Sequence, residues 1–128
     1  MFGFRKKALA NTARDGLVND FNKARAAINS ADRTTQVSIA LGLNIANTMF
    51  FKEFGGPNGF FEETKEQRIK YLKKLNDFEE KMRTQDQLAS LGVAIFKMWI
   101  AALVEDDHDL RGQIEPFLIG LSKLAPGA

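Results

Sequence analysis

The stretch LASLGVAIFKMWIAALV, Leu88–Val104, decides the fold. It carries one charged residue, Lys97, and no proline. A helix that spans a bilayer needs about 20 apolar residues and rarely holds a charge near its centre. The stretch is therefore predicted to be a helix buried almost all round in a protein core, and the rest of the chain must supply the helices that cover it.

Residues 35–54 form a second predicted helix that is apolar around most of its circumference. Only Gln36, Asn44 and Asn47 make a thin polar stripe along it. Such a helix belongs in the middle of a bundle, beside residues 88–104. The turn sequence Gly-Gly-Pro-Asn-Gly at residues 55–59 ends it, because glycine adopts positive φ and proline cannot continue a helix.

Three amphipathic helices are predicted around these two, at about residues 9–28, 61–83 and 110–124. Thr84 and Gln87 have the spacing of a capping box, which predicts that Thr84 starts the helix containing residues 88–104. Alternation at period two is never sustained, so no strand is predicted. The expected fold is all-α: one domain, residues 1–128, forming a bundle of about five helices with the second and fourth at its centre.

The scarcity of reactive side chains excludes several kinds of site. The chain has one histidine, His108, and no cysteine. A zinc site built from histidine and cysteine needs three or four ligands, so it is excluded. The acidic segment at residues 105–109 lacks the spacing and central glycine of a calcium-binding loop and is predicted to cap a helix. No catalytic residue, metal ligand or cofactor is predicted, and the protein is not expected to be an enzyme.

Charge argues against a nucleic-acid partner. The formal net charge is only +2, and the six acidic residues of the helix at 61–83 lie among its basic ones. The glycine-rich turn lacks the Gly-Lys-Ser/Thr ending of a phosphate-binding loop. The absence of cysteine fits a reducing compartment, and no apolar stretch of a signal peptide is visible near the start of the given sequence. A cytoplasmic protein is therefore expected.

His108 lies in a sequence that resembles a known motif. His108-Asp109-Leu110-Arg111-Gly112 is similar to the phosphoacceptor box of sensor histidine kinases and to the His-x-Leu-Lys-Gly core of histidine phosphotransfer domains, with Arg111 in place of the lysine. The resemblance implies an exposed histidine on a helical bundle that accepts a phosphoryl group. The other interpretation is an exposed histidine in an acidic loop with no chemical role.

Residues 1–9 suggest a different alternative, attachment to a membrane surface. Phe2 and Phe4 adjoin three basic residues at positions 5–7. Aromatic and basic side chains together can anchor a helix on acidic lipid. Residues 1–7 offer only a small apolar face, so the two phenylalanines are more simply expected to pack on the bundle.

Five phenylalanines gather around the turn at residues 55–59. They are Phe50, Phe51, Phe54, Phe60 and Phe61. Five rings are more than one tight corner usually hides, which predicts an aromatic patch for a partner or a second copy of the chain. The leading hypothesis is a non-catalytic helical protein–protein interaction module, a small bacterial-type cytosolic adaptor or regulator that forms a homo-oligomer. Phosphotransfer through His108 and membrane attachment through residues 1–9 are the alternatives.

Overall fold

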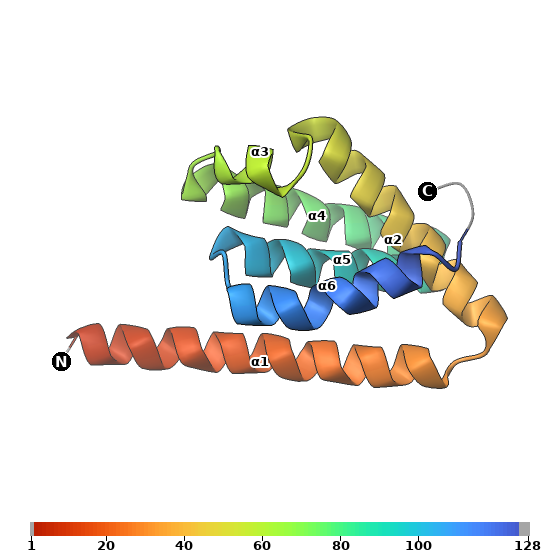
Figure 1. Cartoon of the computed structure of the whole chain (residues 1–128), viewed down its shortest axis with the longest axis horizontal. Coiled ribbons are helices and arrows are strands. Elements are labelled where there is room, and N and C mark those ends of the chain that lie inside the picture. Colours follow the sequence, from red (N-terminus) through yellow and green to blue (C-terminus); the bar gives the residue numbers. More distant parts are fainter. Residues whose placement is uncertain (1, 126–128) are drawn as a thin grey trace.

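The computed structural model describes residues 2–125, with side chains from residue 13 onward. Within this range all regular structure is helical, which confirms the predicted all-α bundle (Figure 1). The helices are α1 (Phe2–Ser30), α2 (Arg33–Phe54), α3 (Pro57–Phe61), α4 (Lys65–Gln85), α5 (Gln87–Val104) and α6 (His108–Ser122). The described residues form six helices, one more than the sequence predicts. The additional helix is the short α3, which forms where only a turn is expected.

Helix α5 is the most central element and packs mainly against α2 and α4. Its one charge is accommodated at the boundary with α4, where Lys97 Nζ lies 2.7 Å from Glu79 Oε1 and 2.8 Å from Asn76 Oδ1. In the described part of the chain α5 alone is long and apolar enough to cross a membrane by length and composition. In this fold 61% of its residues are buried inside the bundle, as expected of a core helix.

Helices α2 and α5 cross backbone against backbone. A Cβ atom added at Gly42 would lie 1.8 Å from the carbonyl oxygen of Ala89, and one added at Gly92 would lie 2.0 Å from that of Ile39. These distances are far shorter than any real contact, so only glycine fits at either position. Leu41 and Ile45 of α2 remain exposed.

Polar side chains set where the long helices begin. Asp32 accepts a hydrogen bond from the amide of Thr35 at the start of α2, and Thr64 caps α4 in the same way. The prediction that Thr84 caps α5 is wrong. Thr84 lies inside α4, where its hydroxyl donates to a backbone carbonyl, and Asp86 is the cap. The Asp86 carboxylate accepts from two amides at the start of α5, and aspartate is a better N-cap than threonine.

The turn after α2 is tighter and more helical than the sequence predicts. Gly55 ends α2 with φ of 77°, and Gly56 follows at 134°. Pro57 then starts α3, because its fixed φ suits the first residue of a helix and its missing N–H is not needed there. This single turn of helix places Phe60 in the core, where it is fully buried.

Helix α1 runs along one side of the bundle (Figure 1). It buries Phe21 and Ile28 against the other helices. Near its middle, Arg14 Nε donates to Asp107 Oδ2 at 2.6 Å, while the other carboxylate oxygen of Asp107 caps α6 by accepting from the amide of Leu110. One carboxylate therefore both starts α6 and ties α1 to it.

The tie between Arg14 and Asp107 should make stability depend on pH. The hydrogen bond from Arg14 is the main cause that holds the pKa of Asp107 below its ordinary value. Because the folded-state pKa is lower than the unfolded value of about 3.9, the stabilisation is present above that value and is lost as pH falls through the folded pKa. We expect Asp107→Asn, which keeps a good helix cap, to lower stability at pH 7 and to reduce its loss in acid. Urea unfolding at pH 7 and pH 3 measures both effects. If the free energy of unfolding falls equally in the wild-type protein and the variant between these two pH values, the prediction is contradicted.

Candidate functional site

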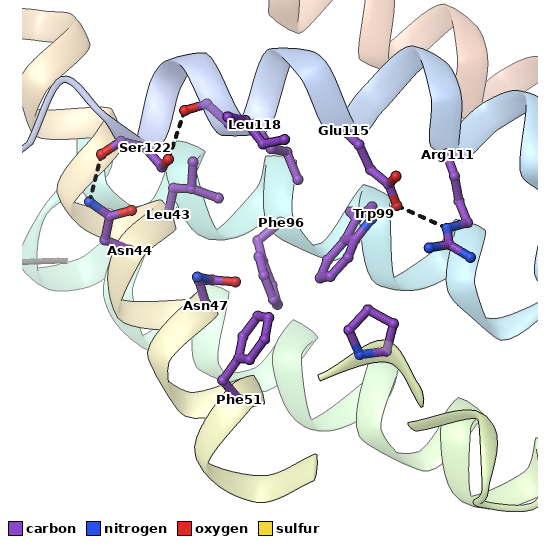
Figure 2. A pocket seen from close by; sticks show the side chains of 12 residues that line it. Leu43, Asn44, Asn47, Phe51, Phe96, Trp99, Arg111, Glu115, Leu118 and Ser122 are labelled. Carbon is purple, nitrogen blue, oxygen red and sulfur yellow. Dashed lines mark hydrogen bonds and ion pairs between the residues drawn. The ribbon is translucent and has the colours of Figure 1, made fainter. Parts of the chain in front are cut away.

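The most developed concave site lies between α2 and α6, above α5. This α2–α6 pocket has a volume of about 350 Å³ and is open to solvent on one side. Its lining residues are Leu43, Asn44, Asn47, Phe51, Pro57, Phe96, Trp99, Arg111, Glu115, Leu118, Ile119 and Ser122 (Figure 2). Most of this lining is apolar, with polar groups at a few places, which is the usual character of a binding pocket.

Aromatic and aliphatic side chains form the walls of the α2–α6 pocket. Phe96 and Trp99 rise from α5 at its base, and their rings pack edge to face with centroids 5.4 Å apart. Phe51 and Ile119 are 44% and 56% exposed, so they lie at its mouth. Exposed apolar side chains that are grouped together mark contact sites, whereas single scattered ones are ordinary surface, and these two are grouped around the mouth of one cavity.

An ion pair occupies one end of the pocket. Glu115 Oε2 accepts from Trp99 Nε1 at 2.8 Å and from Arg111 Nε at 2.9 Å. Arg111 also donates to Asp106 Oδ1 at 3.0 Å. The indole ring of Trp99 is thereby fixed in orientation, and the one carboxylate that lines the pocket is paired with an arginine of the same helix.

An amide group lies at the other end. Asn44 is 7% exposed, and its Nδ2 donates to the carbonyl oxygen of Ser122 at 3.1 Å. Figure 2 shows the nitrogen turned toward Ser122 and the oxygen on the opposite side of the amide. Asn44 therefore satisfies a carbonyl at the C-terminal end of α6, which has no partner within its own helix.

The five phenylalanines around the turn do not form one surface patch. Phe50 and Phe60 are fully buried, and Phe54 and Phe61 are partly buried. Only Phe51 is substantially exposed. The patch predicted from all five rings is corrected accordingly: most of the cluster closes the core beneath the turn, because α3 folds back over the end of α2.

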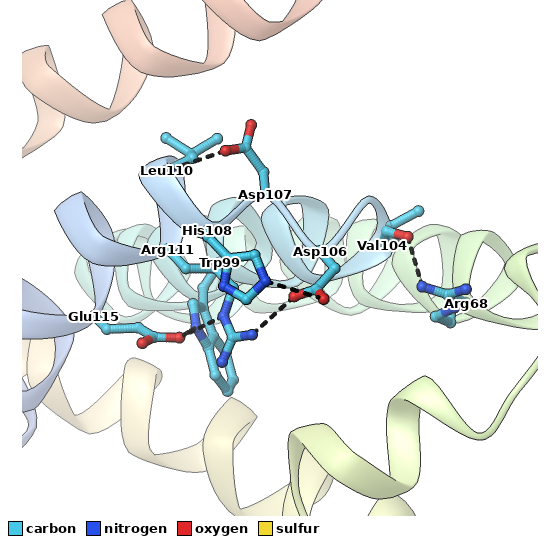
Figure 3. Close-up of polar contacts among 9 residues, drawn as sticks. All are labelled: Arg68, Trp99, Val104, Asp106, Asp107, His108, Leu110, Arg111 and Glu115. Carbon is cyan, nitrogen blue, oxygen red and sulfur yellow. Dashed lines mark hydrogen bonds and ion pairs between the residues drawn. The ribbon is translucent and has the colours of Figure 1, made fainter.

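His108 is the first residue of α6, and its side chain is 82% exposed. Its Nε2 atom lies 3.4 Å from Asp106 Oδ2, and Figure 3 shows the two side chains turned toward each other. A phosphoacceptor histidine of the resembled families sits within a helix, not at its first turn. The position of His108 therefore agrees less with that resemblance than with an exposed histidine beside a helix cap.

We expect His108→Ala to change the free energy of unfolding by no more than about 0.5 kcal/mol, because a largely exposed side chain away from the core contributes little. Urea unfolding measures this. Phosphotransfer would instead require an acid-labile phosphoryl group on the wild-type protein after incubation with a small phosphodonor. If the wild-type protein carries that label and the alanine variant does not, phosphotransfer through His108 becomes the favoured interpretation.

The acidic segment before α6 is engaged in ion pairs. Glu105 pairs with Lys65 at 2.8 Å, and Asp106 and Asp107 pair with arginines as described above. In the part of the chain that the structure describes, no group of three or more histidine, cysteine or acidic residues is placed to hold a metal ion. These carboxylates act in capping and in holding α1, α4 and α6 together.

The proposed membrane anchor, residues 1–9, lies outside the described side chains. Its alternative, Phe2 and Phe4 packing on the bundle, is equally untested. Both remain predictions from the sequence.

The sequence does not identify the α2–α6 pocket. Asn44 and Asn47 attract notice only as a polar stripe, and Glu115 and Trp99 carry no motif. Comparisons with protein-family models, with curated proteins and with solved structures find no match to the chain. What the pocket can do therefore depends on its own chemistry.

Proposed function

We propose that the protein is a non-catalytic helical interaction module. It binds a protein partner at the mouth of the α2–α6 pocket, and the partner to be tested first is a second copy of the same chain. The observation that carries this proposal is the exposure of Phe51 and Ile119 beside an open apolar pocket. Contact sites are commonly centred on aromatic and aliphatic side chains that a partner shields from water. The cytoplasmic location expected from the sequence belongs to the same proposal.

The polar groups of the pocket support binding over catalysis. Its one carboxylate, Glu115, already accepts from Trp99 and Arg111 through the same oxygen. No histidine, cysteine or lysine lines the pocket. A nucleophile needs a neighbouring base, and the hydroxyl of the pocket residue Ser122 donates to the carbonyl of Ile119 instead of to Glu115. The pocket residues do not supply such a pair.

Light scattering at micromolar concentration tests the proposal. We expect the wild-type protein to be a dimer or larger, and Phe51→Asp and Ile119→Asp to be monomers, because a buried unpaired carboxylate is costly at an interface. Leu91→Asp is the matched control, since Leu91 is 48% exposed on α5 and does not line the pocket. Circular dichroism establishes that each variant is folded. A monomeric wild type would contradict self-association, and dissociation by the control variant alone would move the contact away from the pocket.

A further inference from the structure

We propose that the interior of the α2–α6 pocket binds a neutral small molecule that has a compact apolar body and an N–H hydrogen-bond donor, of the class of aromatic primary amides. Such a small-molecule site is separate from the proposed protein contact. The contact uses Phe51 and Ile119 at the mouth, whereas the small molecule would occupy the space between Asn44 and Trp99.

The donor requirement comes from Asn44. The carbonyl of Ser122 can only accept a hydrogen bond, so the Asn44 amide must turn its nitrogen to it. The orientation of the amide leaves Oδ1 on the other side. That oxygen is buried and has no hydrogen-bond partner among the residues that the structure describes. A buried acceptor without a partner is unfavourable, and a ligand N–H that reaches Oδ1 after a small shift of the side chains covering it would remove the penalty.

The apolar body of the ligand is inferred from the side chains that line the α2–α6 pocket. Phe51, Phe96 and Trp99 present three aromatic rings to the pocket, and Leu43 and Leu118 add aliphatic side chains to its lining. A volume of about 350 Å³ is at the small end of the range for ligand pockets. One six-membered ring with a short polar substituent suits both the size and the preference of aromatic rings for edge-to-face packing.

The neutral charge follows from the end opposite Asn44. The carboxylate of Glu115 is paired with Arg111, and Arg111 is paired in addition with Asp106. A charged ligand would have to compete with these contacts and would lose its own hydration on entering an apolar space. A neutral ligand leaves the ion pairs intact.

The resonance of a single indole group reports on the pocket directly. Trp99 is the one tryptophan of the chain, so its indole N–H gives one signal in an amide correlation NMR spectrum. The probes are benzamide, which has N–H donors, and methyl benzoate, which has the same ring and no donor. We expect benzamide to shift the Trp99 signal in a saturable way and methyl benzoate to bind about tenfold more weakly, which is the size of effect expected for one buried hydrogen bond.

Two variants and one control variant localise the effect. Asn44→Leu removes the acceptor at similar volume and should weaken benzamide to the level of methyl benzoate, leaving methyl benzoate unchanged. Ile119→Trp narrows the mouth from an exposed position and should weaken both probes, while Leu91→Ala should affect neither. If Asn44→Leu does not fold, the comparison of the two probes on the wild-type protein still decides the donor requirement. Equal affinity of the two probes, or no shift of the Trp99 signal with either, would overturn the proposal.

The outcome is separable from that of the proposed protein contact. Probe binding is measured at Trp99, and association is measured by light scattering on the same samples. A monomeric protein that binds benzamide in preference to methyl benzoate supports the small-molecule site and contradicts self-association. A dimer whose Trp99 signal is unaffected by benzamide supports self-association and contradicts the small-molecule site.

Discussion

Gly92→Ala is expected to unfold the protein or to lower its free energy of unfolding by more than about 3 kcal/mol, beyond the usual cost of overpacking a core. The added Cβ would lie 2.0 Å from the carbonyl oxygen of Ile39 and 2.4 Å from the amide nitrogen of Leu43. Both atoms belong to the backbone of α2, so no side-chain rotation relieves the overlap. Helices α2 and α5 would have to separate along the contact that builds the core. Urea unfolding followed by circular dichroism measures the effect.

Gly120→Ala provides the matched control for this prediction. Gly120 lies in α6, and a Cβ there meets no atom within 4 Å. Replacing an unobstructed helical glycine with alanine should stabilise the protein by about 0.5–1 kcal/mol. Replacing glycine with alanine is therefore expected to lower the free energy of unfolding at position 92 and to raise it at position 120. A Gly92→Ala protein of unchanged stability would show that α2 and α5 do not pack this closely.

Phe50→Ala is expected to destabilise the protein by about 3–5 kcal/mol, as for other fully buried aromatic side chains. Phe50 is 0% exposed and lies at the centre of the aromatic cluster. Its ring packs at centroid distances of 5.4–6.0 Å against Phe51, Phe54, Phe60, Tyr71, Phe96 and Trp99. Removing it leaves a cavity bordered by several rings that cannot all move inward.

Phe51→Ala, at the next residue, is the control for Phe50. Its ring is 44% exposed at the mouth of the α2–α6 pocket, so we expect a loss of no more than about 1 kcal/mol. Thermal or urea unfolding of the two variants compares neighbouring phenylalanines that differ mainly in burial. Similar losses at both positions would place Phe51 in the core and remove it from the proposed contact.

The fold could be predicted from the sequence because its main features are local. The long apolar stretch at residues 88–104 becomes the central helix α5, and the turn at residues 55–59 ends α2 as expected. The sequence places the cap of α5 two residues too early, since Thr84 and Asp86 are both good capping residues. Which of them starts the helix depends on where α4 ends, and that depends on packing.

The division between Phe50 and Phe51 was present in the sequence but outweighed by the crowding of phenylalanines. Phe50 follows Leu43 and Ala46 at helical spacing, and these positions are buried. Phe51 follows Asn44 and Asn47, which belong to the polar stripe and line the pocket. The two rings therefore lie on different faces of one helix, and only the face of Phe50 continues into the core.

The pocket itself depends on contacts between distant parts of the chain. Asn44 and Ser122, which define one end, are 78 residues apart in sequence. The close crossing at Gly42 and Gly92 that sets the position of α2 over α5 has no local signal either, because a helical glycine also occurs where there is open space, as at Gly120. Such features follow from how helices pack, which the pattern of one helix does not contain.

The attachment of α1 along a single side of the bundle has a consequence for hydrogen exchange. Among its described side chains only Phe21 and Ile28 are buried, and the connection to α2 is limited to Ala31 and Asp32. Detachment of α1 breaks the Arg14–Asp107 pair but leaves the crossing of α2 and α5 in place. The amide hydrogens of α1 should therefore exchange through a partial opening of lower free energy than global unfolding, and those of α5 only when the whole bundle opens.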